Sequence, residues 1–140
     1  MIDNANEWIR LRVSDDPDDN QRAASEPVPL AVWMQIHARA PELRPFIAYN
    51  RTSPPEMLER LASDANWIVR HAVAERVDAS ETLLRELADD VNEKVRVCIA
   101  ANPSTKRDVL QYLSRVDGSD AVRARASARL RAQAHPSSHS

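Results

Sequence analysis

The sequence has almost no glycine or cysteine and few aromatic residues. Its 140 residues include one glycine, Gly118, and one cysteine, Cys98, and aromatic residues make up 4% of the chain. One glycine leaves little material for phosphate-cradling loops or tight β-hairpins, because both need backbone conformations that glycine adopts most easily. One cysteine excludes an intramolecular disulfide and a cysteine-cluster metal site. The core must therefore consist of Leu, Val, Ile and Ala.

Long apolar runs and catalytic signatures are also missing. The acidic start Met1-Ile2-Asp3-Asn4 does not resemble a signal peptide, and no apolar run approaches membrane-spanning length, so we expect a soluble, cytoplasmic protein of bacterial type. No Gly-x-Ser-x-Gly, P-loop or HExxH motif occurs. His37 and His71 have no cysteine or second histidine at metal-ligand spacing, and His135 and His139 fall in an expected tail. We therefore predict no enzyme, no metal site and no cofactor.

Charge is distributed unevenly along the chain. The formal net charge is −2, but residues 1–30 hold seven acidic and three basic residues, whereas residues 105–140 hold seven basic and three acidic residues. The simplest interpretation is two solvated faces. The alternative is an electrostatic dipole that orients a partner or permits head-to-tail stacking.

The most informative pattern is a repeat of about 26 residues. A Leu-x-x-Leu segment recurs three times, at residues 58–61, 84–87 and 110–113, and each copy is followed by a Val-Arg pair. Arg44, Arg70 and Arg96 lie 26 residues apart and Arg123 follows after 27, with Leu43-Arg44 as a weaker first copy. A period of this size without strand alternation predicts stacked helical units that bury their apolar faces against each other.

The predicted fold is all-α: an α-solenoid of about four short helix-turn-helix repeats. We assign residues 1–40 to a helical N-terminal cap, residues 41–132 to the repeats and residues 133–140 to a disordered tail. Trp8 and Trp33 are expected in the core of the cap.

Polar residues mark the expected helix starts. Asn66, Asn92 and Ser119 precede the second helices, where their side chains can accept from free N–H groups of the first turn. Ser53 and Glu56 have capping-box spacing at the start of a first helix.

An aspartate stands six residues before each of three repeat arginines. The pairs are Asp64 and Arg70, Asp90 and Arg96, and Asp117 and Arg123. They predict a stacked structural ladder of charge-assisted hydrogen bonds between carboxylate and guanidinium groups, within repeats and from repeat to repeat. A row of anion-binding arginines is the alternative. Arg44 is expected to be the exception, because Ala38 stands where its aspartate would be.

The aspartate in the inter-helix turn and the Val-Arg of the second helix resemble HEAT-type repeats. The short period, and Asn102-Pro103-Ser104-Thr105 followed by Val109-Leu110, resemble the leucine-rich repeat variant family more closely. The resemblance covers about residues 40–130. It implies short helix pairs stacked into a right-handed superhelix and a role in protein interaction. The founding type's N-terminal iron–sulfur cluster is not implied, because it needs several cysteines and this chain has only Cys98.

Residues beside the apolar stripe of the second helices vary between repeats and indicate a binding surface. If they line the concave side of the solenoid, Tyr49, Trp67 and His71 form an aromatic cluster suited to anchor a protein partner. The alternative is that Trp67 packs against a neighbouring turn or the N-terminal cap. The candidate protein-binding residues are Tyr49, Trp67, His71, Glu75, Glu93 and Lys94.

The expected function is therefore a non-catalytic scaffold or adaptor that recognises a protein. An immunity-type inhibitor that occludes its partner is one version, by analogy with other small repeat proteins. The alternative is nucleic-acid binding through a basic C-terminal helix, with the candidate residues Arg115, Arg125, Arg129 and Arg131. This alternative is weaker, because a groove that follows a nucleic-acid backbone needs positive charge across several repeats.

Overall fold

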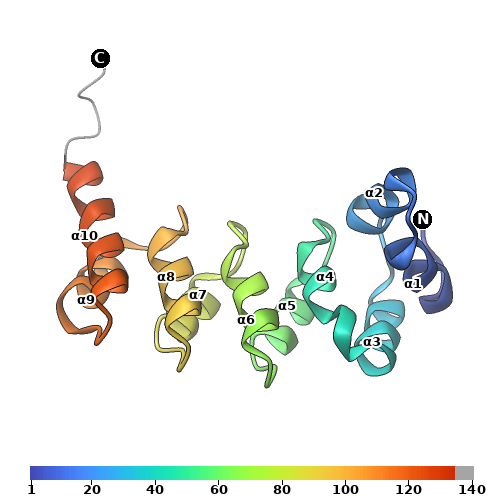
Figure 1. The fold of residues 1–140 in the computed structure, drawn as a ribbon, viewed down its shortest axis with the longest axis horizontal. Helices are drawn as coiled ribbons and strands as arrows, with labels where there is room; N and C mark the ends of the chain where they lie inside the picture. Colours follow the sequence, from blue (N-terminus) through green and yellow to red (C-terminus); the bar gives the residue numbers. More distant parts are fainter. Residues whose placement is uncertain (135–140) are drawn as a thin grey trace, which may run out of the picture. The chain divides into compact units, whose positions relative to one another are not determined.

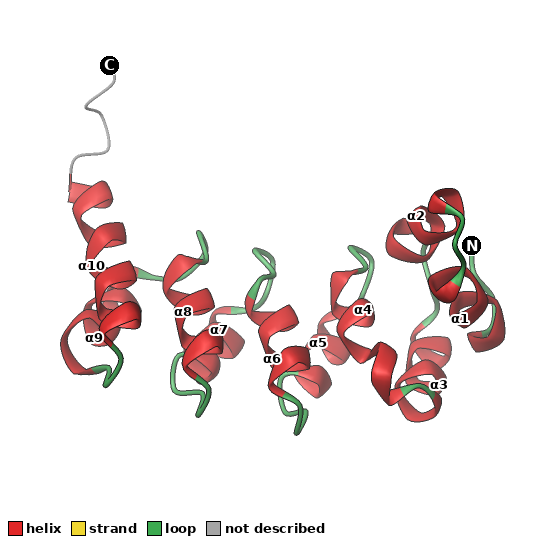
Figure 2. Cartoon of the chain, viewed as in Figure 1, coloured by secondary structure: helices red, strands yellow, loops and turns green. Residues whose placement is uncertain are grey.

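The computed structural model describes residues 1–134, and this part of the chain consists of helices joined by loops (Figures 1 and 2). It contains ten α-helices, one 3₁₀-helix and no strand, which confirms the predicted all-α fold. None of these helices has the length and apolar character needed to cross a bilayer. The chain divides after Val73 into two compact units, each with its own internal packing. The predicted tail lies outside the described residues except for Gln133 and Ala134, which end the last helix.

The first unit begins with helices that belong to the predicted cap. Within it, α1 packs against α2 and α3, and α4 packs against α3 and α5. Its helices are α1 (Ala5–Val13), α2 (Pro17–Ser25), α3 (Leu30–Arg39), the 3₁₀-helix η1 (Pro41–Leu43), α4 (Arg44–Tyr49), α5 (Pro55–Leu61) and α6 (Trp67–Ala74), whose last residue already belongs to the second unit.

Two tryptophans form the centre of the first unit's core. Trp8 and Trp33 are both fully buried, and their rings meet edge to face with centroids 5.5 Å apart. The indole N–H of Trp8 donates to the carbonyl oxygen of Ala23 at 2.9 Å. The indole N–H of Trp33 has no acceptor among the described residues. The prediction that both residues belong to the core is confirmed.

The second unit contains two helix pairs, in which α8 contacts α7 and α10 contacts both α8 and α9. Their bounds are α7 (Glu81–Leu87), α8 (Glu93–Ala101), α9 (Arg107–Val116) and α10 (Asp120–Ala134). The leucines of the repeated Leu-x-x-Leu segments, including Leu84, Leu87, Leu110 and Leu113, are buried. Spacings of three and four residues place these side chains on one helix face, which is the face that packs.

The three predicted caps of the second helices are confirmed. The side-chain oxygen of Asn66 accepts from the N–H of Ile68 at 2.9 Å, and that of Asn92 accepts from the N–H of Lys94 at 2.8 Å. The hydroxyl of Ser119 accepts from the N–H of Val122, three residues later, at 3.4 Å. Each cap satisfies a backbone donor that has no partner within the first turn.

The predicted capping box at Ser53 is wrong. The N-cap residue of α5 is Pro54, which makes no side-chain cap hydrogen bond. Ser53 is buried, and its hydroxyl donates to the carbonyl oxygen of Ile47 in α4. Thr105 makes the same contact with Ile99 in α8, at 2.7 Å. A hydroxyl at this position therefore ties a connecting loop to the end of the preceding helix.

Candidate functional site

The guanidinium of Arg70, Arg96 and Arg123 donates a hydrogen bond to a backbone carbonyl oxygen in the turn before its own helix. Nη1 of Arg70 donates to the carbonyl oxygen of Asp64 at 2.8 Å, and Nη1 of Arg96 donates to that of Asp90 at 2.8 Å. Arg123 makes the matching bond to the carbonyl oxygen of Asp117. The spacing of six residues was predicted to bring carboxylate and guanidinium together, but within a repeat the guanidinium binds the main chain instead.

The aspartate carboxylates of the turns have two other roles. Oδ1 of Asp64, Asp90 and Asp117 each accepts, at 2.9 Å, from the backbone N–H two residues later. This bond orders the turn and presents the cap residue to the following helix. The second role, shown for Asp64 and Asp117, is to pair with the arginine of the preceding repeat.

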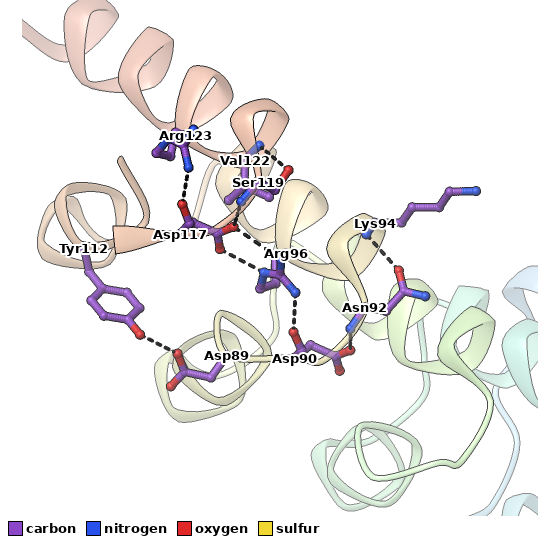
Figure 3. A network of polar contacts seen from close by, with 10 residues as sticks. All are labelled: Asp89, Asp90, Asn92, Lys94, Arg96, Tyr112, Asp117, Ser119, Val122 and Arg123. Atoms are coloured by element: carbon purple, nitrogen blue, oxygen red, sulfur yellow. Dashed lines mark hydrogen bonds and ion pairs between the residues drawn. The ribbon is translucent and has the colours of Figure 1, made fainter. Parts of the chain in front are cut away.

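Figure 3 shows this pairing in the second unit, where Arg96 lies between the turn at Asp90 and the side chain of Asp117. Nε of Arg96 donates to Oδ2 of Asp117 at 2.8 Å, and Nη2 donates to Oδ1 at 3.3 Å. The Asp117 side chain is 5% exposed. The hydrogen bond that Arg96 donates to this carboxylate raises the pKa of Arg96 above its usual value. The guanidinium thereby joins two successive repeats.

In the first unit, Arg44 makes the equivalent contact, so the expectation that it lacks an aspartate is wrong. Nη1 of Arg44 lies 3.1 Å from Oδ2 of Asp64, whose side chain is 7% exposed. Nε donates to the carbonyl oxygen of His37 at 2.9 Å, which takes the place of the turn carbonyl. Arg44 and Arg96 are thus held by two repeats each. The interpretation as anion-binding arginines finds no support in this geometry.

A second set of cross-repeat hydrogen bonds was missed in the sequence. Nδ2 of Asn102 donates to the carbonyl oxygens of Ala74 and Arg76, both at 2.9 Å. Nδ2 of Asn50 donates in the same way to the carbonyl oxygen of Ala23 at 2.8 Å. Asn50 and Asn102 are fully or almost fully buried and lie 52 residues apart, which is twice the repeat period. The sequence signal that could have revealed these bonds is an asparagine that recurs after two repeat periods, at positions 50 and 102.

Arg129, predicted as part of a basic patch, belongs to this second set. Its Nη1 donates to the carbonyl oxygens of Ala100 and Asn102, at 3.1 and 2.9 Å. Arg115 on α9 and Arg125 and Arg131 on α10 are exposed. These three exposed bases lie on the last two helices. They therefore do not form the stripe of positive charge across several repeats that a nucleic-acid groove would need.

The candidate protein-binding residues of the first unit lie on α4 and α6. Tyr49 ends α4, is 42% exposed, and meets Phe46 edge to face with ring centroids 6.1 Å apart. Trp67 begins α6 and is half-buried, and its ring meets that of His71 edge to face at 6.0 Å. Ile68, beside Trp67, is 46% exposed and was not singled out in the sequence, where Lys94 and Ala121 stand at the matching positions of the next two repeats.

The remaining candidates belong to the second unit. Glu93 and Lys94 are exposed in the first turn of α8, and Glu75 is exposed in the segment before α7. Cys98 is half-buried in α8. Burial, and then the charge of Glu75, raises the pKa of its thiol to about 11. The thiol is therefore protonated near neutral pH and is a poor nucleophile.

A hollow that the sequence did not indicate lies between α7 and α9. Its volume is about 320 Å³, and it is lined by Arg85, Ala88, Asp89, Asp108, Val109 and Tyr112. The Tyr112 hydroxyl donates to Oδ1 of Asp89 at 2.9 Å (Figure 3). This bond raises the pKa of Tyr112. A smaller hollow of about 220 Å³ also borders Asp89 and Tyr112 and extends to Asp117 and Gly118.

Comparisons with protein-family models, with curated proteins and with solved structures found no match to this chain. Its function therefore has to be inferred from its own residues and geometry.

Proposed function

We propose that the chain is a non-catalytic helical-repeat scaffold that recognises a protein partner through its second helices. The proposed architecture is a right-handed α-solenoid of about four repeats of the HEAT-like or leucine-rich repeat variant type. Recurrence of the same polar contacts at the repeat spacing supports it. The turn carboxylate binds its own turn, the arginine binds the turn carbonyl, and the arginine also binds the next repeat's aspartate.

The observation that carries the proposed activity is the group of exposed apolar and aromatic side chains on α4 and α6. Tyr49 and Ile68 each expose more than two fifths of their surface, and Trp67 is half-buried against His71. Tyr and Trp are enriched among residues that dominate binding energy at protein interfaces. Surface-exposed aromatic and aliphatic groups at the ends of short helices offer a partner apolar area that is already rigid.

Rigidity matters because a surface that is already ordered loses little entropy when a partner binds. Arg44 holds the start of α4 to the turn before α6 through Asp64. Asn66 in that turn caps α6 directly before Trp67. The ladder therefore fixes the helices that present Tyr49 and Trp67.

The same contacts argue against a catalytic role. The two almost fully buried turn carboxylates, Asp64 and Asp117, are each paired with an arginine. The thiol of Cys98 is held protonated by its surroundings. A protonated thiol is a poor nucleophile, and carboxylates that already bind a guanidinium are not free to accept a proton from a substrate.

Affinity capture from a lysate of the source cells tests the proposal. We expect the immobilised chain to retain a specific protein, and the double substitution Tyr49→Ala with Ile68→Glu to abolish retention. Val13→Glu, which places the same charge at an exposed apolar position at the end of α1, is the matched control and should leave retention unchanged. Circular dichroism checks that each variant remains helical. Equal retention by the double variant and the wild-type chain would exclude α4 and α6 as the contact.

A further inference from the structure

The hollow between α7 and α9 lies outside the surface proposed above. We propose that this hollow seats an arginine side chain of a protein partner. Its size, its apolar floor and aromatic wall, and the balance of charge around its rim support this assignment separately.

The size and floor fit one long side chain. At about 320 Å³ the hollow is at the lower end of the range of ligand sites and too small for a large cofactor. Its lining includes Ala88 and Val109, both buried apolar residues. The ring of Tyr112 borders the same space and is 48% exposed. A methylene stem can lie on such a floor while its charged end remains at the rim.

The charges at the rim are predominantly negative. Arg85 is the lining base, and its Nη2 lies 2.8 Å from Glu81 and 2.9 Å from Asp108. The hydrogen bond that Arg85 donates to Glu81, and then that to Asp108, raises the pKa of Arg85. Asp89 has no ion-pair partner within residues 1–134, so the lining of the hollow holds two carboxylates, Asp89 and Asp108, and one guanidinium. An anionic guest would have to separate Arg85 from its partners, whereas a cationic guest finds an unneutralised carboxylate.

The position of Asp89 and Tyr112 favours a guanidinium group over other cations. Tyr112 reaches from α9 to Asp89, two residues after the end of α7, and its hydroxyl donates to that carboxylate (Figure 3). This bond fixes the ring and the carboxylate side by side, and a carboxylate retains further acceptor positions after one such bond. A guanidinium is planar, so it can stack on the ring while its N–H groups bind the carboxylate. An ammonium group cannot do both equally well.

A titration of the full ¹⁵N-labelled chain with Nα-acetyl-arginine amide, followed by NMR, tests the proposal. We expect saturable shifts of the backbone amides of Ala88, Asp89, Val109 and Tyr112. Nα-acetyl-citrulline amide has almost the same shape without the charge and should give no saturable shift. Nα-acetyl-lysine amide should bind several-fold more weakly than the arginine compound. No saturable shift with arginine, or equal binding of citrulline or lysine, would overturn the proposal.

Variants locate the site. Asp89→Asn should weaken arginine binding roughly tenfold, since it removes the charge that is not otherwise paired. Glu86→Gln makes the same charge change at an exposed position of α7 outside the hollow and should alter affinity less than about twofold. Tyr112→Phe should retain most binding, and Tyr112→Leu should lose several-fold. Unchanged affinity in Asp89→Asn would contradict the proposal.

The wild-type comparison of arginine with citrulline decides the question even where a variant fails to fold. This binding is measured on α7 and α9, whereas the proposed function is tested on α4 and α6. The two proposals can therefore fail independently.

Discussion

Arg96 and Asp117 are 21 residues apart in the chain, yet Nε of Arg96 donates to Oδ2 of Asp117 at 2.8 Å. The same arginine holds the carbonyl oxygen of Asp90 in the turn of its own repeat. One guanidinium thus determines the register of two successive helix pairs. The carboxylate is almost fully buried, so loss of its charge leaves Arg96 without its main counter-charge.

The first prediction concerns this ion pair. Asp117→Asn keeps the side-chain oxygen that accepts from the N–H of Ser119 but removes the charge that pairs with Arg96. We expect the free energy of unfolding to fall by about 2–4 kcal/mol. Asp120→Asn removes a carboxylate that is 95% exposed and paired with Arg123, and should cost less than about 1 kcal/mol. Equal losses in urea unfolding would show that the buried pair has no special role.

The second prediction compares the two buried tryptophans. Trp8→Phe and Trp33→Phe remove the same atoms from the same core, but the Trp8 indole N–H donates to Ala23 whereas that of Trp33 has no acceptor among the described residues. Trp8→Phe should therefore destabilise the fold by about 1 kcal/mol more than Trp33→Phe. Thermal unfolding of both variants measures the difference. A larger loss in Trp33→Phe would contradict the hydrogen-bond assignment.

The third prediction concerns the buried amide of Asn102. Asn102→Asp replaces the side-chain NH2 group, which donates to the carbonyl oxygens of Ala74 and Arg76, with a carboxylate oxygen that cannot donate. We expect a loss of about 2–4 kcal/mol, because a buried charge would meet two acceptors. Asn92→Asp makes the same chemical change at a cap, where the side chain only accepts, and should be near neutral. Comparable losses at the two positions would argue against the cross-repeat role of Asn102.

The fourth prediction concerns Cys98. Burial raises the pKa of its thiol to about 11, above the reference value of 9.0, so the folded chain holds the neutral form. The stability that this preference contributes is complete below the reference pKa and is lost as pH rises through the folded pKa. Alkylation of the folded chain by iodoacetamide should be slow at pH 8 and should accelerate up to about pH 11. A midpoint near the reference value of 9.0, as in an exposed thiol, would contradict this environment.

The helix pairs and the caps of the second helices could be predicted from the sequence because both depend on local features. The apolar spacing of Leu84 and Leu87 determines which face of α7 is buried, and Asn92 caps the helix that begins one residue later. Such signals act within one or two turns and are readable in a single repeat.

The partners of the charged residues were harder to predict because they depend on how one repeat lies against the next. The spacing of six residues indicated that Arg96 pairs with Asp90, but the Asp90 backbone takes the bond and Asp117 supplies the charge. No aspartate stands six residues before Arg44, and its carboxylate partner, Asp64, lies 20 residues later, so the spacing did not indicate the pair. The hollow beside Tyr112 was missed for the same reason, since its walls come from two separate helices.

Photo-crosslinking in source cells tests the central claim, that α4 and α6 contact a protein, most directly. The photoreactive residue p-benzoylphenylalanine replaces the exposed Ile68 of α6 in one variant and the exposed Gln35 of α3 in the other. We predict a discrete, nuclease-resistant protein adduct at position 68 and none at position 35. No protein adduct at position 68, or the same adducts at both positions, would contradict the account.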